Sequence, residues 1–283
     1  MHIPVLQKEV IQYLNPKPNE NFIDCTVGEG GHSSLLLEKI APHGKVLGID
    51  YQLRLKSRDR LILAEDNFAN LKEIVQKEDF KNVSGILLDL GLSSWHLEES
   101  KRGFSFLRNE SLDMRYNRNN PLTAEKIINY WSEADIERIV REYGEEKFSR
   151  QIVKAIINAR KIRPIQKTLQ LAKIIGSAVP GWYKRQKINF ATKTFQALRI
   201  AVNNELANLE KVLPQAIEIL KKEGRLVVIS FQSLEDRIVK NFLKQRAGEE
   251  KIRILTKKPV SPLFSEIKIN PRARSAKLRA LKK

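Results

Sequence analysis

The sequence predicts an α/β fold built on a mainly parallel sheet, and three observations support this. First, residues 22–27 form a short apolar run that leads directly into Gly28, Gly30 and Gly31 and then into a helical pattern. Second, further apolar runs of strand length alternate with helical patterns along the first third of the chain. Third, residues 83–90 are apolar almost throughout, as expected for a strand buried on both faces of a parallel sheet.

The glycine turn after the first strand predicts a nucleotide-type ligand. A strand, a glycine turn and a helix form the entry unit of nucleotide-binding sheets, because glycines allow a sharp turn and a close approach of ligand to backbone. The helix begins near Ser33, and a second strand over residues 45–50 ends on Asp50. An acid about 20 residues after the glycines commonly binds ribose hydroxyls. The pattern therefore indicates an adenosine-type cofactor.

The residues of the turn favour S-adenosylmethionine over a dinucleotide. Gly28-x-Gly30-x-x-Ser33 lacks the third glycine of the dinucleotide fingerprint. Asp24 and Glu29 place carboxylates near the turn, where a pyrophosphate would be repelled, whereas the sulfonium and ammonium of S-adenosylmethionine are positive. A nicotinamide-dependent oxidoreductase and an ordinary tight turn without a ligand are the alternatives.

Composition indicates a polyanionic partner. The 283 residues include 51 Lys and Arg against 33 Asp and Glu, which gives a net charge of +18. Such an excess suggests nucleic acid, although a general enrichment in lysine is an alternative.

The single cysteine excludes a disulfide framework and a cysteine-ligated cluster, and no metal is expected. The start has too short an apolar run for a signal peptide and no membrane-length run follows, so we expect a cytoplasmic protein.

The alternation of strands and helices continues to about residue 96. Residues 61–66 are predicted to form a third strand, and a helix over residues 67–80 places Phe68 on its inner face. The buried strand then ends at Asp89. Because ligands bind beyond the carboxyl ends of parallel strands, residues 89–96 are expected to face the cofactor.

Beyond that point only helical patterns appear, which predicts an inserted helical domain. We place this domain at residues 103–203 and assign it to substrate recognition, with the α/β domain formed by residues 1–102 and 204–283. Residues 194–220 form one long helical pattern that Pro214 should break or kink. The sheet resumes at residues 224–231, a helix follows over residues 234–242, and residues 270–283 contain six basic residues and no acid.

Eight motifs spread over residues 2–279 resemble the MraW (RsmH) family of bacterial small-subunit rRNA (cytosine-N4)-methyltransferases. They are His2-Ile-Pro-Val-Leu6, Asp24-x-Thr-x-Gly-x-Gly-Gly-His-Ser33, Asp89-Leu-Gly-x-Ser-Ser94, Arg102-Gly-Phe-Ser-Phe106, Leu112-Asp-Met-Arg115, Phe195-Gln-Ala-Leu-Arg-Ile200, Ser230-Phe-x-Ser-Leu-Glu-Asp-Arg237 and Arg272-Ala-Arg-Ser-Ala-Lys-Leu-Arg279. Several are long and specific, so the resemblance covers nearly the whole chain.

The resemblance implies a class I, Rossmann-like methyltransferase fold with an inserted helical domain. It implies S-adenosyl-L-methionine as methyl donor and the N4 amine of a cytidine in the decoding region of 16S rRNA as acceptor. Carried over by motif, the cofactor contacts fall on Gly30, Gly31, His32, Asp50, Phe68, Asp89 and His96.

Three positions depart from the family pattern. His96 stands where glutamine is usual, and Asn189 and Gln232 stand where histidines are usual. The departures at Asn189 and Gln232 support one alternative function, a cofactor-binding protein of RNA binding or ribosome assembly with weak catalysis. We instead take them to mean that the chemistry does not depend on those histidines.

Asp89 is the leading candidate for a catalytic residue. Cytosine N4 is a poor nucleophile, so methyl transfer needs close positioning and an acceptor for the amine protons. Asp89 would serve as that acceptor or as a cofactor contact, and the sequence leaves both roles open. Cys25 lies inside the first strand, where a small core residue is expected. A cysteine-dependent attack on a pyrimidine ring is therefore excluded.

Aromatic and basic residues indicate where RNA would bind. Trp95, Phe104, Phe106 and Trp182 are candidates for stacking on an extruded base, although core packing is the more common role for any one of them. The run that contains Trp182, Lys184 and Arg185 mixes aromatic with basic side chains, as single-stranded RNA sites do. In the C-terminal segment the expected phosphate contacts are Arg272, Arg274, Lys277 and Arg279. For this segment, a solvated basic end is the alternative. The chain is expected to be a monomer or a homodimer.

Overall fold

The computed structural model describes residues 4–249 and 252–283, without the side chain of Ser94. His2 and Ile3 of the first family motif lie outside these residues. The chain divides into two compact units, of which the first contains Met1–Gly91 and Leu206–Lys283 and the second contains Leu92–Glu205. Within the described ranges no helix is long and apolar enough to cross a membrane.

The first unit is built on one seven-stranded sheet with the order β3-β2-β1-β4-β5-β7-β6. The strands are β1 (Asn21–Asp24), β2 (Val46–Asp50), β3 (Leu61–Glu65), β4 (Val83–Asp89), β5 (Leu220–Ser230), β6 (Arg253–Ile254) and β7 (Lys277–Lys282). The first five pair in parallel, and β7 runs antiparallel to β5 and β6. The mixed α/β fold class is therefore confirmed. Because the strand order reverses between β1 and β4, a ligand crevice is expected beyond their carboxyl ends.

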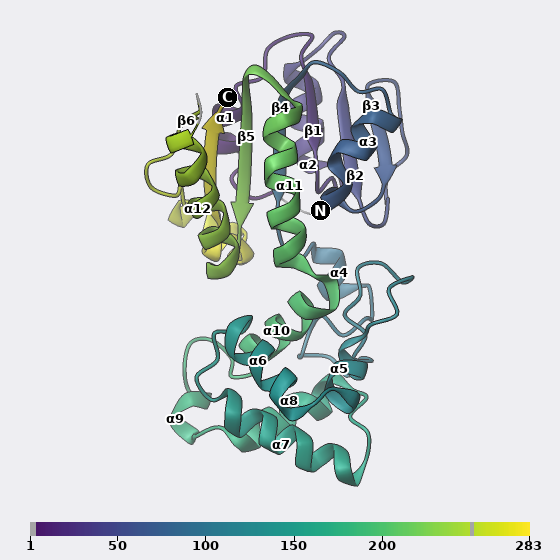
Figure 1. Cartoon of the computed structure of the whole chain (residues 1–283), viewed down its shortest axis with the longest axis vertical. Helices are drawn as coiled ribbons and strands as arrows, with labels where there is room; N and C mark the ends of the chain where they lie inside the picture. Colours follow the sequence, from purple (N-terminus) through teal and green to yellow (C-terminus); the bar gives the residue numbers. More distant parts are fainter. Residues whose placement is uncertain (1–3, 250–251) are drawn as a thin grey trace. The chain divides into compact units, whose positions relative to one another are not determined.

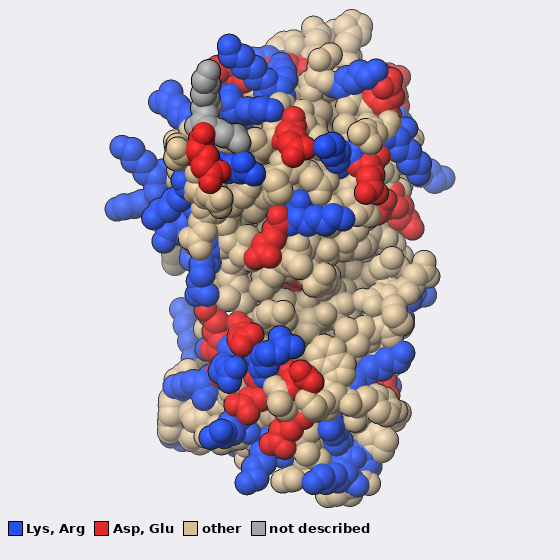
Figure 2. Space-filling view, in the orientation of Figure 1, with Lys and Arg blue, Asp and Glu red and all other residues tan. Residues whose placement is uncertain are grey.

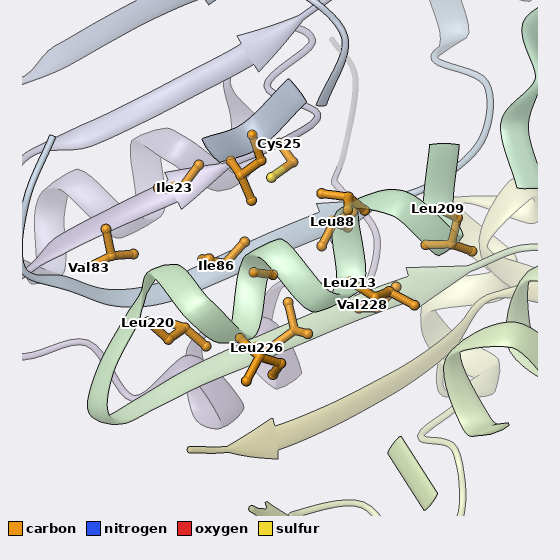
Figure 3. Packing of buried hydrophobic residues seen from close by; sticks show 14 of the residues in the cluster. Ile23, Cys25, Val83, Ile86, Leu88, Leu209, Leu213, Leu220, Leu226 and Val228 are labelled. Atoms are coloured by element: carbon orange, nitrogen blue, oxygen red, sulfur yellow. The ribbon is translucent and has the colours of Figure 1, made fainter. Parts of the chain in front are cut away.

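Helices cover both faces of this sheet (Figure 1). The helices are α1 (Gln7–Leu14), α2 (Gly31–Lys39), α3 (Leu71–Lys77), α11 (Glu205–Ile219), α12 (Ser233–Glu249) and α13 (Phe264–Ile269), with 3-10 turns η1 (Phe68–Asn70) and η2 (Pro271–Ser275). One buried cluster joins the sheet to α3, α11 and α12, and another joins its opposite face to α1 and α2. In Figure 3, Leu209 and Leu213 of α11 lie over Leu88 of β4 and Val228 of β5.

The centre of the sheet leaves no room for a larger side chain at Gly85 of β4. A Cβ there would lie 2.5 Å from Cε1 of Phe22 and 3.1 Å from Cδ2 of Leu14. Both neighbours are fully buried, so neither can move without disturbing the core.

Gly85→Ala should therefore destabilise the first unit by about 1–3 kcal/mol through overpacking. Gly248→Ala is the matched control, because no described residue lies within 4 Å of its added Cβ in α12. It should be neutral or stabilising by up to about 1 kcal/mol, since alanine is the better helix former. Amide hydrogen exchange along β4 measures the stability of the first unit in both variants. Tryptophan fluorescence would not report on the sheet, because all three tryptophans lie in the second unit. Equal exchange rates in the two variants would contradict the packing argument.

The long helix predicted over residues 194–220 is two helices, and the break is not at Pro214. α10 (Thr192–Asn203) ends at Asn204, which has a left-handed φ of 52°, and α11 continues through Pro214. Asparagine adopts this conformation more readily than most residues. Leu213 and Ile217 are buried on either side of the proline, and their packing outweighs the missing hydrogen bond.

The C-terminal segment is also different from the solvated basic end that was the alternative to phosphate contacts. After η2 the chain enters the sheet as β7, where Leu278, Ala280 and Leu281 are buried. This pairing with β5 explains why the segment is ordered although it carries many charges.

The second unit consists of short helices around one apolar core. They are α4 (Ser94–Glu98), α5 (Ala124–Tyr130), α6 (Glu133–Glu142), α7 (Ser149–Ile162), α8 (Thr168–Ala178), α9 (Gly181–Lys184) and α10. The unit begins at Leu92 rather than at residue 103, because Leu92 and Leu97 pack against the helical core. Thr123 and Ser132 accept backbone hydrogen bonds from Lys126 and Asp135 and so cap α5 and α6.

Candidate functional site

The glycine turn lies between the end of β1 and the start of α2, and it is tightly packed. Gly28 and Gly30 have φ values of +50° and +77°, in the left-handed region that favours glycine. A Cβ on Gly30 would lie 2.7 Å from Cδ1 of Leu55, and one on Gly31 would lie 2.2 Å from Cγ of Pro4. The turn can therefore keep this shape only with glycine at these positions.

Asp24 holds the turn from inside. Its buried carboxylate accepts a 2.7 Å hydrogen bond from Oγ of Ser33 and a 3.2 Å bond from the backbone N–H of Thr26. Burial raises the pKa of Asp24 above its ordinary value. Cys25 beside it is a core residue, and burial raises the pKa of its thiol well above the usual range. A thiol in that state is a poor nucleophile, which agrees with the expectation for Cys25.

Asp50 ends β2 and is aimed at the same turn. One carboxylate oxygen accepts a 2.9 Å hydrogen bond from the backbone N–H of Gly28, and the other accepts a 3.4 Å bond from that of Gln52. Burial raises the pKa of Asp50. Carboxylate oxygens have further lone pairs, so Asp50 retains capacity to accept a hydroxyl hydrogen.

Asp89 ends β4 and lies against His32 of α2. Its backbone N–H donates a 2.8 Å hydrogen bond to Oγ1 of Thr26, which fixes the end of β4 against the turn. Its Oδ2 lies 3.5 Å from Nε2 of His32. Its Oδ1 is buried and has no hydrogen-bond partner among the described residues. A buried carboxylate oxygen without a partner is costly, and a ligand that donates a hydrogen bond would satisfy it.

His32 is buried among these carboxylates. Burial lowers its pKa, but the hydrogen bond and charge of Asp89 and the charges of Asp24 and Glu266 outweigh this, so the pKa of His32 is raised. The balance favours a protonated imidazole, which offsets part of the negative charge in the site.

The expected cofactor residues other than His96 lie in the first unit at the carboxyl edge of the sheet. Phe68 begins η1 after β3 and is half-buried. His96 belongs to α4 of the second unit, where its Nδ1 lies 2.7 Å from Oγ of Ser93 and its ring contacts Phe104 and Tyr116. The cofactor role of His96 stays a prediction.

The turn fits a cationic ligand better than a pyrophosphate. In phosphate-binding turns the backbone N–H groups point at the ligand. Here the N–H of Gly28 donates to Asp50, and the N–H of Gly30 donates to the carbonyl of Val27 at 2.7 Å. With these donors engaged and Asp24, Asp50 and Asp89 around the turn, the site suits the sulfonium and ammonium groups of S-adenosylmethionine. The same facts disfavour the nicotinamide alternative.

In the second unit, Trp182 of α9 forms an exposed aromatic group with Lys147. The Trp182 side chain is 49% exposed, and Nζ of Lys147 lies 4.4 Å from its ring centroid. Phe148 and Tyr183 support the indole from the side, and Lys184 and Arg185 are exposed beside it. Lys147 was not predicted here, because it is distant from Trp182 in the sequence and only the folded chain brings them together.

The other aromatic candidates are less accessible. Phe104 is buried in the helical core, Phe106 packs partly against it, and Trp95 lies beneath the guanidinium of Arg102 at 5.3 Å. Core packing, the common role for such residues, is therefore observed for Phe104.

Arg279, one of the four basic residues expected to contact phosphates, has a different role in the structure. It is buried in β7 and donates hydrogen bonds of 2.6 and 3.2 Å to the two carboxylate oxygens of Asp236. Nζ of Lys277 lies 3.4 Å from the same carboxylate. Arg279 is thus a structural residue, because strand alternation turns it inward. Arg272 and Arg274 are exposed, and their phosphate role stays a prediction.

Both departures at histidine positions have local partners. The side-chain oxygen of Asn189 accepts a 2.9 Å hydrogen bond from the backbone N–H of Ala191, just before α10. The side-chain nitrogen of Gln232 donates a 3.2 Å bond to Glu235 in the first turn of α12. These contacts give the two amides a structural role, and they offer no support for lost catalysis.

Comparisons with known proteins match the whole chain to one family. A family model described as the MraW methylase family matches residues 1–283. The chain is 42% identical over 307 residues to the ribosomal RNA small subunit methyltransferase H of Heliobacterium mobile, covering 100% of this chain and 98% of that protein. It is 45% identical over 293 residues to the protein of that name from Persephonella marina, covering 100% and 99%. An rRNA methylase structure from Streptococcus thermophilus is 11% identical with a TM-score of 0.44 over 98% and 93% of the two chains, too distant to support an argument.

Proposed function

The chain belongs to the MraW methylase family, and from this premise we propose that it transfers a methyl group from S-adenosyl-L-methionine to the N4 amine of a cytidine in the decoding region of 16S rRNA. The observation that carries the proposal is the family match over residues 1–283. Relatives that share 42–45% of its residues along its whole length are named as methyltransferases of small-subunit rRNA. Since its substrate belongs to the bacterial ribosome, we place the protein in the cytoplasm.

The first unit supplies the cofactor site of this proposal. Gly30 and Gly31, which pack against Leu55 and Pro4, present the backbone of the turn to the cofactor. Asp50 accepts ribose hydroxyl hydrogens, and Phe68 offers a half-buried aromatic face for the adenine. S-adenosylmethionine supplies an electrophilic methyl group on a positive sulfur. Asp24 and Asp89, with the turn they hold, surround this positive charge with a negative potential.

Asp89 supplies the acceptor for the amine. When N4 bonds to the methyl carbon and the sulfur–carbon bond breaks, the nitrogen must lose one proton. We assign Oδ1 of Asp89 to accept a hydrogen bond from this amine and then the proton that the nitrogen releases, because that oxygen is buried and lacks a partner in the described structure. The hydrogen bond orients the nitrogen lone pair toward the methyl group, and positioning of this kind lowers a barrier by up to ~10 kcal/mol.

The second unit is assigned to recognition of the RNA. A base to be methylated must leave its stack, and exposed aromatic side chains stabilise extruded or unpaired bases. Trp182 with Lys147, Lys184 and Arg185 has the composition of such a surface. The unit therefore contributes affinity for RNA, and the first unit contributes the chemistry.

Methyl transfer from radiolabelled S-adenosylmethionine to small ribosomal subunits tests the function. We expect label in 16S rRNA, and nuclease digestion with mass spectrometry should identify N4-methylcytidine. Calorimetry should also detect cofactor binding to the protein alone. Cofactor binding without transfer to subunits or to protein-free rRNA would favour the assembly-protein alternative, and label on another base would contradict the N4 assignment.

A further inference from the structure

A second surface of the first unit combines exposed apolar and basic side chains. We call residues 257–274, which contain α13 and most of η2, the α13 segment. Its three exposed apolar side chains are Leu263, Phe264 and Ile269, at 67%, 82% and 70% exposure. They are the large exposed apolar residues of the first unit within the described ranges, and they lie within seven positions of one another. Isolated exposed apolar residues are ordinary, but a group of this kind marks an interaction surface.

The segment is held in place from its inner side. One carboxylate oxygen of Glu266 accepts a 2.7 Å hydrogen bond from the backbone N–H of Leu6. Ala273 and Ala276 are buried in the apolar cluster behind the sheet, and Ile267 is half-buried. The exposed side chains are therefore presented by an anchored segment, so a partner would not have to order them.

This anchoring also places the segment beside the candidate cofactor site. Leu6 lies two residues after Pro4, whose ring packs against Gly31 of the turn. Glu266 is close enough to His32 to act on it electrostatically. A polymer bound at the reaction site thus has the α13 segment as a neighbour within the same unit.

The charge around the apolar group indicates the chemistry of the partner. Lys257, Lys258, Lys268, Arg272 and Arg274 are exposed in the segment, and Glu266 is its single acid. Phe264 and Lys268 are four residues apart on α13, so they share one face of the helix. β6, which precedes the segment in the chain, adds exposed Arg253, and α12 on the opposite face of the sheet carries exposed Arg237, Lys240 and Lys244. Figure 2 shows Lys and Arg gathered along the edge where α12 and β6 lie.

We propose that the α13 segment binds single-stranded rRNA next to the target nucleotide, with Phe264 stacked on an unpaired base and the lysines and Arg274 on the flanking phosphates. The inference rests on the proposed function and adds a second RNA contact to the one on the helical unit. A surface that bound its partner by charge alone would not need to expose Leu263, Phe264 and Ile269 to water. Aromatic stacking among cations is the usual way to bind an unpaired strand without reading its sequence.

Phe264→Ala should raise the KM for small ribosomal subunits about tenfold, because one base–aromatic stack is lost. The Kd for S-adenosylmethionine should not change, and Phe264→Trp should restore the KM. Lys268→Ala should weaken binding and reduce the slope of log K against log salt by about 1. The matched controls are Ile162→Ala, an apolar side chain that is 86% exposed, and Lys77→Ala at the end of α3, which follows β3 at the opposite edge of the sheet. Neither control should change the KM by more than about twofold.

Ultraviolet cross-linking with mass spectrometry identifies the partner. We expect a nucleotide adduct on the peptide that contains Phe264, and its loss in Phe264→Ala. A cross-link from this peptide to a ribosomal protein, or an unchanged KM in Phe264→Ala, would overturn the inference. Failure of the proposed function would look different, because the unaltered chain would then transfer no methyl group to any small-subunit RNA.

Discussion

Asp89→Asn lowers kcat for methyl transfer by about 10²–10⁴-fold, the range expected when a group that accepts a proton or hydrogen bond in the transition state is lost. Asparagine is nearly isosteric with aspartate but carries no charge, so it is a weaker acceptor for the amine hydrogen. The backbone bond from residue 89 to Thr26 is independent of the side chain, and the end of β4 should keep its position. The Kd for S-adenosylmethionine should therefore change by less than about tenfold.

Single-turnover transfer and cofactor calorimetry on the same preparation separate the two roles of Asp89. Glu29→Gln is the matched control, because Glu29 is an exposed carboxylate on the same turn and pairs with Arg54 at 3.1 Å. It should leave kcat within about threefold of the unaltered protein, since exposed ion pairs contribute little. A large rise in the cofactor Kd with unchanged kcat in Asp89→Asn would instead make Asp89 a cofactor contact.

Asp236→Ala should destabilise the first unit by about 3–5 kcal/mol, the cost of leaving a buried charge without its partner. The guanidinium of Arg279 would remain in the interior between α12 and β7 with the bidentate acceptor removed. Asp236→Leu combined with Arg279→Met should recover most of the loss, because neither remaining side chain carries a charge. Lys277 is half-buried and can turn toward water in that variant.

Hydrogen exchange of β7 amides against denaturant measures this loss within the first unit. The matched control is Glu218→Ala, which breaks the 3.0 Å pair with Lys72 on the surface of the same unit and should cost less than about 1 kcal/mol.

The stability that Asp236 contributes should depend on pH. Burial disfavours the charged form of Asp236, but Arg279 and Lys277 outweigh burial and hold the pKa of Asp236 below its ordinary value. The contribution of Asp236 is therefore complete above about pH 4 and is lost as the pH falls through the lower folded-state pKa. A constant difference between the variants down to pH 2 would contradict this.

The strands and the turn were predictable from sequence because their signals are local. A run buried on both faces must be apolar at nearly every position, which identifies β4 without reference to its neighbours. A turn with left-handed φ values requires glycine, which identifies Gly28 and Gly30. The acids Asp50 and Asp89 follow directly from the strand ends, since parallel strands place their carboxyl ends along one edge.

The features that the sequence patterns predicted differently from the structure depend on contacts between distant segments. Pro214 has a strong local tendency to end a helix, but burial of Leu213 and Ile217 against the sheet outweighs it. The basic C-terminal segment has the composition of a solvated end, and only its pairing with β5 makes it a strand. Arg279 resembles its neighbours Arg272 and Arg274 in sequence, and Asp236 is what distinguishes it.

By itself, the sequence determined the α/β class, the adenosine-type turn with its acids, and the family to which the chain belongs, because these depend on short patterns that survive without tertiary context. The tertiary structure decided which polar groups are already engaged and which are not. In the folded chain, the N–H of Gly28 donates a hydrogen bond to Asp50, and Arg279 donates to Asp236. Oδ1 of Asp89 has no partner among the described residues, and Phe264 is exposed on an anchored helix. The physical reason is that a side chain's capacity to bind a ligand depends on its burial and its hydrogen bonds, and residues far apart in the chain supply both.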